Sequence, residues 1–178
     1  MAGTWSAITS TNTASIQSMI TAMTAFHPYY STLTVAQVQT AMNNHSQVKA
    51  FLYSDGSNVG AVIVTPNPDW PSINVYMMGY SGPATAAQAA SVFAAKVFTE
   101  MGVYGYQYIW GTCPKDVSTT AKAIAFYTAL PAALTAAGFF AVFSNHPSQA
   151  DGNQWTLEGV TSSTGGLIQS QITGLPLP

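Results

Sequence analysis

The chain has 178 residues, of which 48% are hydrophobic and only 6% are charged, and its formal net charge is −2. This length suits one domain with a full hydrophobic core. Because four basic residues stand against six acidic ones, no basic surface exists to neutralise a run of phosphates, and the composition speaks against a nucleic-acid-binding protein.

Two helices are predicted at the start of the chain. Apolar residues recur at helical spacing over residues 12–26, and His27-Pro28 should end this helix because proline disfavours helical geometry in the residue before it. A second, short helix is predicted after Thr34 and should end near Asn43-Asn44. Its inward-facing residues are expected to be Val35, Val38 and Met42.

From residue 47 the hydrophobic pattern becomes that of strands. Residues 47–54 and 58–65 flank the turn-forming segment Asp55-Gly56-Ser57 and predict a hairpin, and residues 72–80 predict a third strand. An alanine-rich helix is then expected over 84–101, with Gly102 as its stop.

The remaining elements alternate between strand and helix. An aromatic strand is predicted over 104–111, followed by a helix over 118–137 that Pro131 should break or kink and Gly138 should close. Strands over 139–144 and 154–160 complete the predicted order. These elements predict a single α/β (α+β) domain over residues 1–160, with an apolar tail over 161–178.

This order of elements resembles that of the GNAT acetyltransferase superfamily over about residues 10–160. Ala125-Phe126-Tyr127 followed by Gly138-Phe139 is similar to the family's pattern of a tyrosine and then Gly-Phe, although the gap between them is longer here and contains Leu130-Pro131. The resemblance implies a mixed, mainly antiparallel central sheet flanked by helices.

The resemblance also implies a place for acetyl-CoA after the strand 72–80. Of the family signature, Gly82 and Ala84 are present, Gly79 replaces the usual Arg or Gln, and Pro83 lacks an N–H group to donate. The main chain at Val75 and Met77 would complete the cofactor site. With no lysine or arginine nearby in the sequence, we expect this loop to hold a diphosphate poorly.

For catalysis, the resemblance implies that Tyr127 is the general acid. The base is missing, because Asn74, Tyr76 and Met78 occupy the strand positions where the family often has a glutamate, and none of them accepts a proton near neutral pH. A water molecule or a distant carboxylate would have to act as the general base. Glu100 and Glu158 are expected to be solvated surface charges.

Other reactive residues give weaker patterns. His27, His45 and His146 lie in different loops or helix ends without a helical partner, so no metal site is predicted. The single cysteine, Cys113, forms neither a disulfide nor a cysteine-built zinc site within the chain and is expected to be a small packing residue.

Two apolar features leave alternatives open. By strand alternation Tyr104, Tyr106, Tyr108 and Trp110 share one side of their strand, which is either core beneath the helix 84–101 or an exposed contact surface. The tail is too apolar for a solvated segment, and it should dock either on its own domain or on a neighbouring subunit. The residues that make it apolar are Leu167, Ile168, Ile172, Leu175 and Leu177.

Together these features predict a non-enzymatic structural or interaction protein with a degenerate GNAT-like fold. The low charge favours assembly with other protein subunits, and the family resemblance suggests a bacteriophage virion component. The alternative is an acetyl-CoA-dependent N-acetyltransferase, and a third reading is a binding module for another ligand. With no signal peptide and no apolar run that could span a bilayer, we expect a virion or cytoplasmic location and no membrane partner.

Overall fold

A computed structural model describes residues 3–67, 72–104, 108–114, 119–144 and 154–161. In these residues the chain begins with a short strand and alternates thereafter between helices and strands. The elements in chain order are β1 Thr4–Ile8, α1 Thr13–Thr24, the 3-10 helix η1 Pro28–Thr32, α2 Val35–Asn44, β2 Lys49–Ser54, β3 Val59–Asn67, β4 Ser72–Ser81, α3 Ala86–Tyr104, β5 Tyr108–Pro114, α4 Ala121–Ala137, β6 Phe139–Ser144 and β7 Gln154–Thr161.

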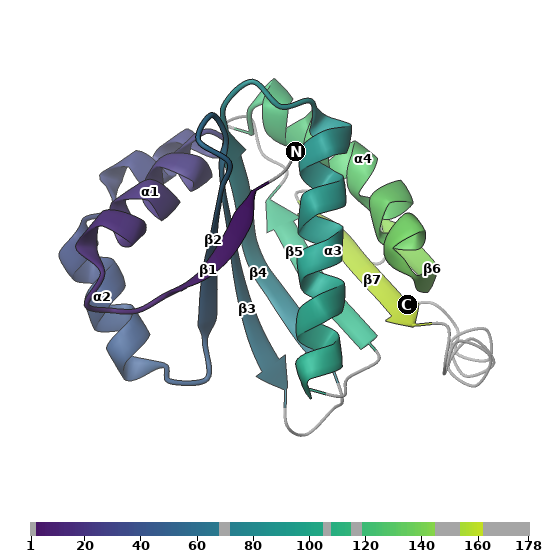
Figure 1. The fold of residues 1–178 in the computed structure, drawn as a ribbon, viewed down its shortest axis with the longest axis horizontal. Helices are drawn as coiled ribbons and strands as arrows, with labels where there is room; N and C mark the ends of the chain where they lie inside the picture. The colour runs from purple at the N-terminus through teal and green to yellow at the C-terminus, as the bar shows by residue number, and fades with distance from the viewer. Residues whose placement is uncertain (1–2, 68–71, 105–107, 115–118, 145–153, 162–178) are drawn as a thin grey trace.

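Within the described residues the strands form one seven-stranded sheet in the order β1-β2-β3-β4-β5-β7-β6 (Figure 1). Strands β1 to β4 form an antiparallel meander, and β7 pairs antiparallel with both β5 and β6. Of the strand pairs in the described residues, only β4 and β5 are parallel, because α3 carries the chain back along the sheet between them. The predicted mixed, mainly antiparallel sheet flanked by helices is confirmed.

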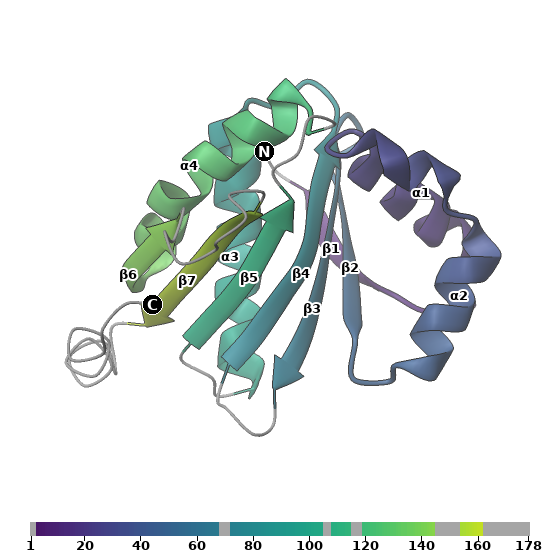
Figure 2. The same cartoon turned by 180° about the vertical axis from the view of Figure 1, so that it is seen from behind.

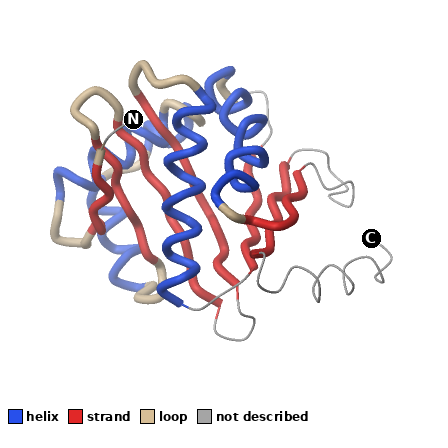
Figure 3. Tube along the Cα trace, turned by 45° about the vertical axis from the view of Figure 1, so that its right-hand side comes forward, coloured by secondary structure: helices blue, strands red, loops and turns tan. Residues whose placement is uncertain are grey.

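Alternation along the strands builds an apolar core on each face of the sheet. On one face α3 and α4 pack together over β3, β4 and β5 (Figure 3). Phe93 and Phe126 lie in this core and are at most 1% exposed. On the other face α1 packs its buried stripe on β2, β3 and β4. That stripe consists of Ile16, Met19, Ile20 and Met23.

Tyr108, the first residue of β5, lies on the face of the sheet opposite α3. Ile109 is fully buried in the core beneath α3 and α4, so its neighbour Tyr108 lies on the opposite side of the sheet. Figure 2 shows β4 and β5 from that side, without a described helix in front of them. For Tyr108, the interpretation as core beneath the helix 84–101 is therefore wrong.

The sequence prediction missed one strand and misplaced the boundary between α3 and β5. An edge strand, β1, precedes α1; its short segment has too weak an alternation to be recognised, and pairing with β2 holds it in place. Helix α3 continues through Gly102 to Tyr104, since a single glycine weakens a helix without ending it. As a consequence β5 begins at Tyr108 and not at Tyr104.

Helix α4 is continuous from Ala121 to Ala137 and contains Pro131, so the predicted break does not occur. Packing against α3 holds the helix together on both sides of the proline, where Leu130 and Leu134 are buried. As predicted, Gly138 closes the helix, with a φ of +116°.

Among the described residues, no helix has the length and apolar character needed to cross a bilayer. The segment predicted as a tail lies outside the described residues apart from Thr161, which ends β7. The division of the chain at residue 160 stays a prediction.

Candidate active site

Strands β4 and β5 part halfway along β4. Their parallel pairing runs from Ser72 and Tyr108 to Val75 and Gly111, whereas β4 continues to Ser81. At the same point the register between β3 and β4 shifts, so that Tyr76 is an extra residue between Val75 and Met77. Such a bulge bends and twists its strand. The second half of β4 therefore leads away from β5 and into the loop before α3.

Two side chains, Asn58 of the β2–β3 turn and Gln88 of α3, hold the loop between β4 and α3 by hydrogen bonds. Gly82 has a φ of +106°, and a Cβ there would lie 2.5 Å from the carbonyl oxygen of Ser57, so this position requires glycine. The N–H of Ala84 donates to Oδ1 of Asn58 at 2.8 Å, and the N–H of Thr85 donates to Oε1 of Gln88 at 3.0 Å. Because Pro83, which precedes them, has no N–H group, three successive residues offer no N–H group to a ligand.

Asn58 reaches this loop from the hairpin turn between β2 and β3. Only 7% of Asn58 is exposed, and its Nδ2 donates to both carboxylate oxygens of Asp55, at 2.9 and 3.2 Å. Hydrogen bonds from the side chain of Asn58, then from its backbone and that of Ser57, lower the pKa of Asp55. The turn thus braces the loop through one buried amide and one carboxylate.

A lysine from α4 lies beside the same loop. Nζ of Lys122 donates to the carbonyl oxygen of Gly82 at 2.8 Å and lies 4.6 Å from the centre of the Tyr80 ring. The expectation that no cation would be available at this loop is therefore wrong. Lys122 follows Gly82 by 40 residues, and only the packing of α4 beside α3 brings the two together.

Tyr127, the predicted acid, projects from α4 toward the end of α1. Its Oη lies 3.1 Å from Nε2 of His27, and the two residues are 7% and 2% exposed. The ring of Phe26 packs against Tyr127 and Tyr80, with centroids 5.6 and 5.4 Å apart. Sequence reasoning missed His27 as a partner of Tyr127, since 100 residues separate them and no local pattern connects them.

Hydrogen bonds join the end of α1 to the start of α4. The N–H of Thr120 donates to the carbonyl of Phe26 at 3.0 Å, and its hydroxyl donates to the carbonyl of Ala25 at 2.8 Å. The same hydroxyl accepts the N–H of Ala123 and caps α4. Thr120 thus fixes the position of His27 relative to Tyr127.

The other predicted cofactor residues lie along β4. Val75 is the last residue of β4 that pairs with β5, and Met77, just beyond the bulge, pairs with Ile63 of β3. Gly82 and Ala84 lie in the loop already described. The roles given to all four residues, and to Tyr127, stay predictions.

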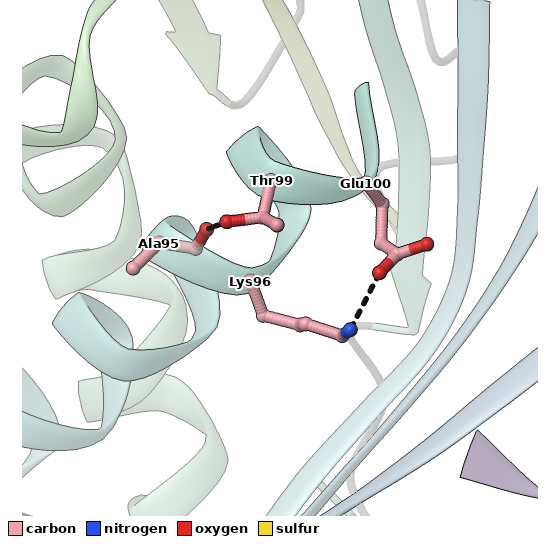
Figure 4. Close-up of polar contacts among 4 residues, drawn as sticks. All are labelled: Ala95, Lys96, Thr99 and Glu100. Carbon is pink, nitrogen blue, oxygen red and sulfur yellow. Dashed lines mark hydrogen bonds and ion pairs between the residues drawn. The ribbon is translucent and has the colours of Figure 1, made fainter. Parts of the chain in front are cut away.

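Glu100 is not the solvated charge that the sequence predicted. It is 7% exposed and forms an ion pair with Lys96 one turn earlier on α3 (Figure 4). The ammonium group of Lys96 also lies 3.8 Å from the centre of the Phe51 ring. Glu100 is therefore bound in the packing of α3 on the sheet. The side chains of Glu158 and Cys113 lie outside the described part, in which no three His, Cys, Asp or Glu side chains gather as a metal site would require.

No protein-family model and no curated protein matches the chain. Solved structures do match. An aminoglycoside 6'-acetyltransferase of type Ii has a TM-score of 0.60 at 12% identity, over 88% of this chain and 96% of that one. The fold is that of the GNAT acetyltransferases.

Further GNAT-like structures agree over the same extent. A mutant of the spermidine N-acetyltransferase SpeG from Vibrio cholerae has a TM-score of 0.57 at 12% identity, over 91% of this chain and 95% of that one. The NatC complex, solved with Gag peptide and CoA, has a TM-score of 0.55 at 8% identity, over 90% of this chain and 99% of that one. The expected GNAT-like fold is thus confirmed, and at such identities the likeness concerns the fold alone.

Proposed function

We propose that this chain is an acetyl-CoA-dependent N-acetyltransferase that holds the diphosphate of its cofactor with Lys122. The observation that carries the proposal is where this lysine lies. Lys122 is the second residue of α4, and it reaches the loop that leads into α3. Both helix N-termini carry partial positive charge, and neither helix has an acidic residue in its first turn. Because both helix ends are partly positive, the ammonium group of Lys122 beside them is favourable when an anion binds next to it.

The residues present fit a diphosphate, but the donors differ from those of the family signature at residues 79–84. The N–H groups of Ala84 and Thr85 already have acceptors, and Pro83 has no N–H group to donate. The hydrogen-bond ladder of α3 begins with the N–H of Ala89, so the N–H groups of Ala86 and Ala87 have no acceptor within the helix. These two amides and Lys122 supply the donors and the charge that an anion needs.

The proposed chemistry requires a proton donor. When bound, acetyl-CoA supplies an acetyl group activated as a thioester. Tyr127 holds a phenolic proton at Oη for the departing thiolate, and the proton that the attacking amine gives up would pass to a water molecule, because the described residues place no carboxylate base at this site. His27 Nε2, 3.1 Å from this oxygen, is placed to return a proton to it. Because both side chains are nearly buried, bulk water is kept away from the pair.

Calorimetric titration with acetyl-CoA tests the binding step. Wild-type protein should bind it, and a thousandfold excess over the dissociation constant should stabilise the fold by about 4 kcal/mol. Lys122→Met keeps the aliphatic stem over Tyr80 and removes the charge, which should weaken binding at least about tenfold. Lys49→Met, at an exposed lysine on β2, should bind like wild type. Absence of any melting shift at millimolar acetyl-CoA would refute the proposal.

Acetyl transfer is tested with a panel of amines. A polyamine, an aminoglycoside and a peptide with a free N-terminus represent the acceptor chemistry named for the similar structures. On any acceptor that reacts, Tyr127→Phe should lower kcat about 100-fold or more while acetyl-CoA affinity is retained. If acetyl-CoA affinity fell as much as kcat, Tyr127 would be a cofactor-binding residue and not the general acid.

A second candidate function is a non-enzymatic interaction protein. The observation that favours it is the internal hydrogen bonding of Ala84 and Thr85, which leaves this loop structurally complete without a ligand. On this reading the chain assembles with other protein subunits, and its place in a bacteriophage particle is an expectation from family resemblance. The mass of the purified species by light scattering tests assembly, and a monomer at all concentrations would contradict it.

A further inference from the structure

The proposed proton donor and its partner are covered by the short helix η1. Tyr127 is 7% exposed and His27 is 2% exposed, which leaves little surface at which an acceptor amine could meet Oη of Tyr127. The rings of Tyr29 and Tyr30 pack against His27, with centroids 5.7 and 6.0 Å from that of His27 and 4.2 Å from each other. Tyr29 is itself 43% exposed, so η1 lies between the pair and the solvent.

Helix α2, which follows η1, is held weakly against the rest of the fold. None of its residues is buried, whereas α1 has five buried residues. Its apolar residues Val35, Val38 and Met42 are only partly buried where they meet the core around α1. A cavity of about 470 Å³ lies between α2, α1 and the strands β2 and β3. An element with so few buried apolar contacts opens more readily than the core of a protein.

Helix α2 is also complete in itself, so it can move without losing its own hydrogen bonds. Thr34 and Gln37 form a capping box at its start, and at its end the N–H of His45 donates back into the helix at 3.1 Å. Nε2 of Gln39 donates to the carbonyl of Ser10 at 2.8 Å, which ties α2 to the segment that follows β1. An opening of α2 must break this bond, so Gln39 is the position at which an opening can be tested.

We propose that η1 and α2, residues 28–44, form a lid over the His27–Tyr127 pair, and that this lid opens as one unit while the sheet and the other helices stay folded. In the open form the rings of Tyr29 and Tyr30 leave His27, and an acceptor amine can approach Oη of Tyr127. The role of the lid in admitting an acceptor rests on the proposed transferase function. The opening itself does not depend on that function.

Native-state amide hydrogen exchange tests whether the lid opens as a unit. The amides of residues 38–44 in α2 should share one protection factor, at least about 100-fold smaller than that of the buried stripe of α1. Gln39→Ala removes the bond to Ser10 and should lower the protection of α2 about threefold to tenfold, because one hydrogen bond is lost, and leave α1 unchanged. Gln17→Ala, at an exposed position of α1, should leave the protection of α2 unchanged.

Diethyl pyrocarbonate, which modifies accessible imidazole rings, tests whether the opening uncovers His27. Mapped by mass spectrometry, His27 should react about threefold to tenfold faster in Gln39→Ala than in wild type, by the same factor as α2 exchange. Exposed His45 is the internal reference, and its rate should not change. Met42→Ala removes an apolar contact of the lid and should accelerate both α2 exchange and His27 modification.

Two results would overturn the lid. One is equal protection of α2 and α1, and the other is unchanged reactivity of His27 in variants whose α2 exchange has accelerated. Both measurements use the chain without acetyl-CoA. A failure to bind that cofactor would therefore refute the transferase function without changing the result for the opening, and acetyl transfer by a chain whose α2 does not open separately would refute the lid alone.

Discussion

At the residue scale, Asp55 and Asn58 link the hairpin turn to the loop that precedes α3. Asp55 accepts hydrogen bonds from the backbone of Ser57 and Asn58 at 3.0 and 2.7 Å, and Asn58 in turn accepts the N–H of Ala84. Because these donors favour the ionised form of Asp55, its pKa is lower in the folded chain than its usual value of 3.8. The hydrogen bonds of this turn are therefore stronger while the carboxylate is charged.

Acid should therefore weaken the fold through Asp55. Its contribution is fully present above the unfolded pKa and is lost as the pH falls through the lower folded value. Between pH 5 and pH 2 the free energy of unfolding should fall more steeply for wild type than for Asp55→Asn, as measured by urea denaturation at each pH. Asn58→Ala removes the largest cause of the lowered pKa and should also flatten the curve. Parallel curves for all three proteins would contradict the assignment.

Residue patterns indicate local chemistry and miss partners that only folding brings together. Thr85 and Gln88 stand three apart at the start of a helix, and Asp55-Gly56 marks a turn, so both features are readable along the chain. The bond from Lys122 to Gly82 is not, because charge alone does not say which carbonyl a lysine reaches 40 residues away. For this reason the loop was expected to lack a cation.

At the element scale, the ion pair of Lys96 and Glu100 lies between α3 and the sheet. The side chains of the two residues are 13% and 9% exposed, and Phe51 of β2 lies beneath the ammonium group. Two charges withdrawn from water depend on each other, so removing one leaves the other without compensation.

Lys96→Met should therefore destabilise the chain by about 3–5 kcal/mol, which can be measured by chemical denaturation. The double variant Lys96→Met with Glu100→Leu removes both charges and should recover most of that loss. Lys49→Met provides the control for losing a lysine from an exposed position. A double variant as unstable as the single one would show that packing, and not the unpaired carboxylate, sets the cost.

Substitution of Pro131, in the middle of α4, should stabilise the fold. Proline gives no N–H to the helical ladder and its ring crowds the preceding turn, yet the helix is continuous through it. Pro131→Ala should raise the free energy of unfolding by about 1–3 kcal/mol, measured by thermal and urea denaturation. Exposed Ala132→Pro, one position later, should destabilise. A loss of stability in Pro131→Ala would mean that the ring contributes more through packing than it costs in backbone bonding.

The elements that were predicted correctly have strong periodicity and clear ends. Helix α2 begins after its capping residue Thr34 and ends at Asn44, as expected. Element type failed where the local signal was ambiguous: Tyr104 continues α3 because one glycine weakens a helix without ending it, although its aromatic neighbours suggested a strand. Strand β1 forms by pairing with the edge of β2, and the five residues of β1 alone do not indicate this pairing.

At the scale of the whole molecule, the two parts of the sheet, β1–β4 and β5–β7, are joined by a short run of strand pairing. Strands β4 and β5 share four paired positions, so the meander β1–β4 and the group β5–β7 have a limited ladder between them. The contact between the end of α1 and the start of α4 adds to it: Thr120 bonds to Ala25 and Phe26, and Tyr127 bonds to His27. Helix–helix packing of α3 on α4 supports the same junction.

Thr120→Val tests how much this junction contributes. The substitution keeps the shape of the side chain and removes both the bond to Ala25 and the cap on Ala123, so the free energy of unfolding should fall by about 1–2 kcal/mol. Amide hydrogen exchange should accelerate at Thr120 and also at His27, because both lie at the contact that loosens. Thr128→Val removes a hydroxyl that bonds only within α4, to Ile124, and should leave exchange at both sites unchanged. If exchange in Thr120→Val accelerates at the start of α4 but not at His27, the two parts are held together by the sheet and the helix pair alone.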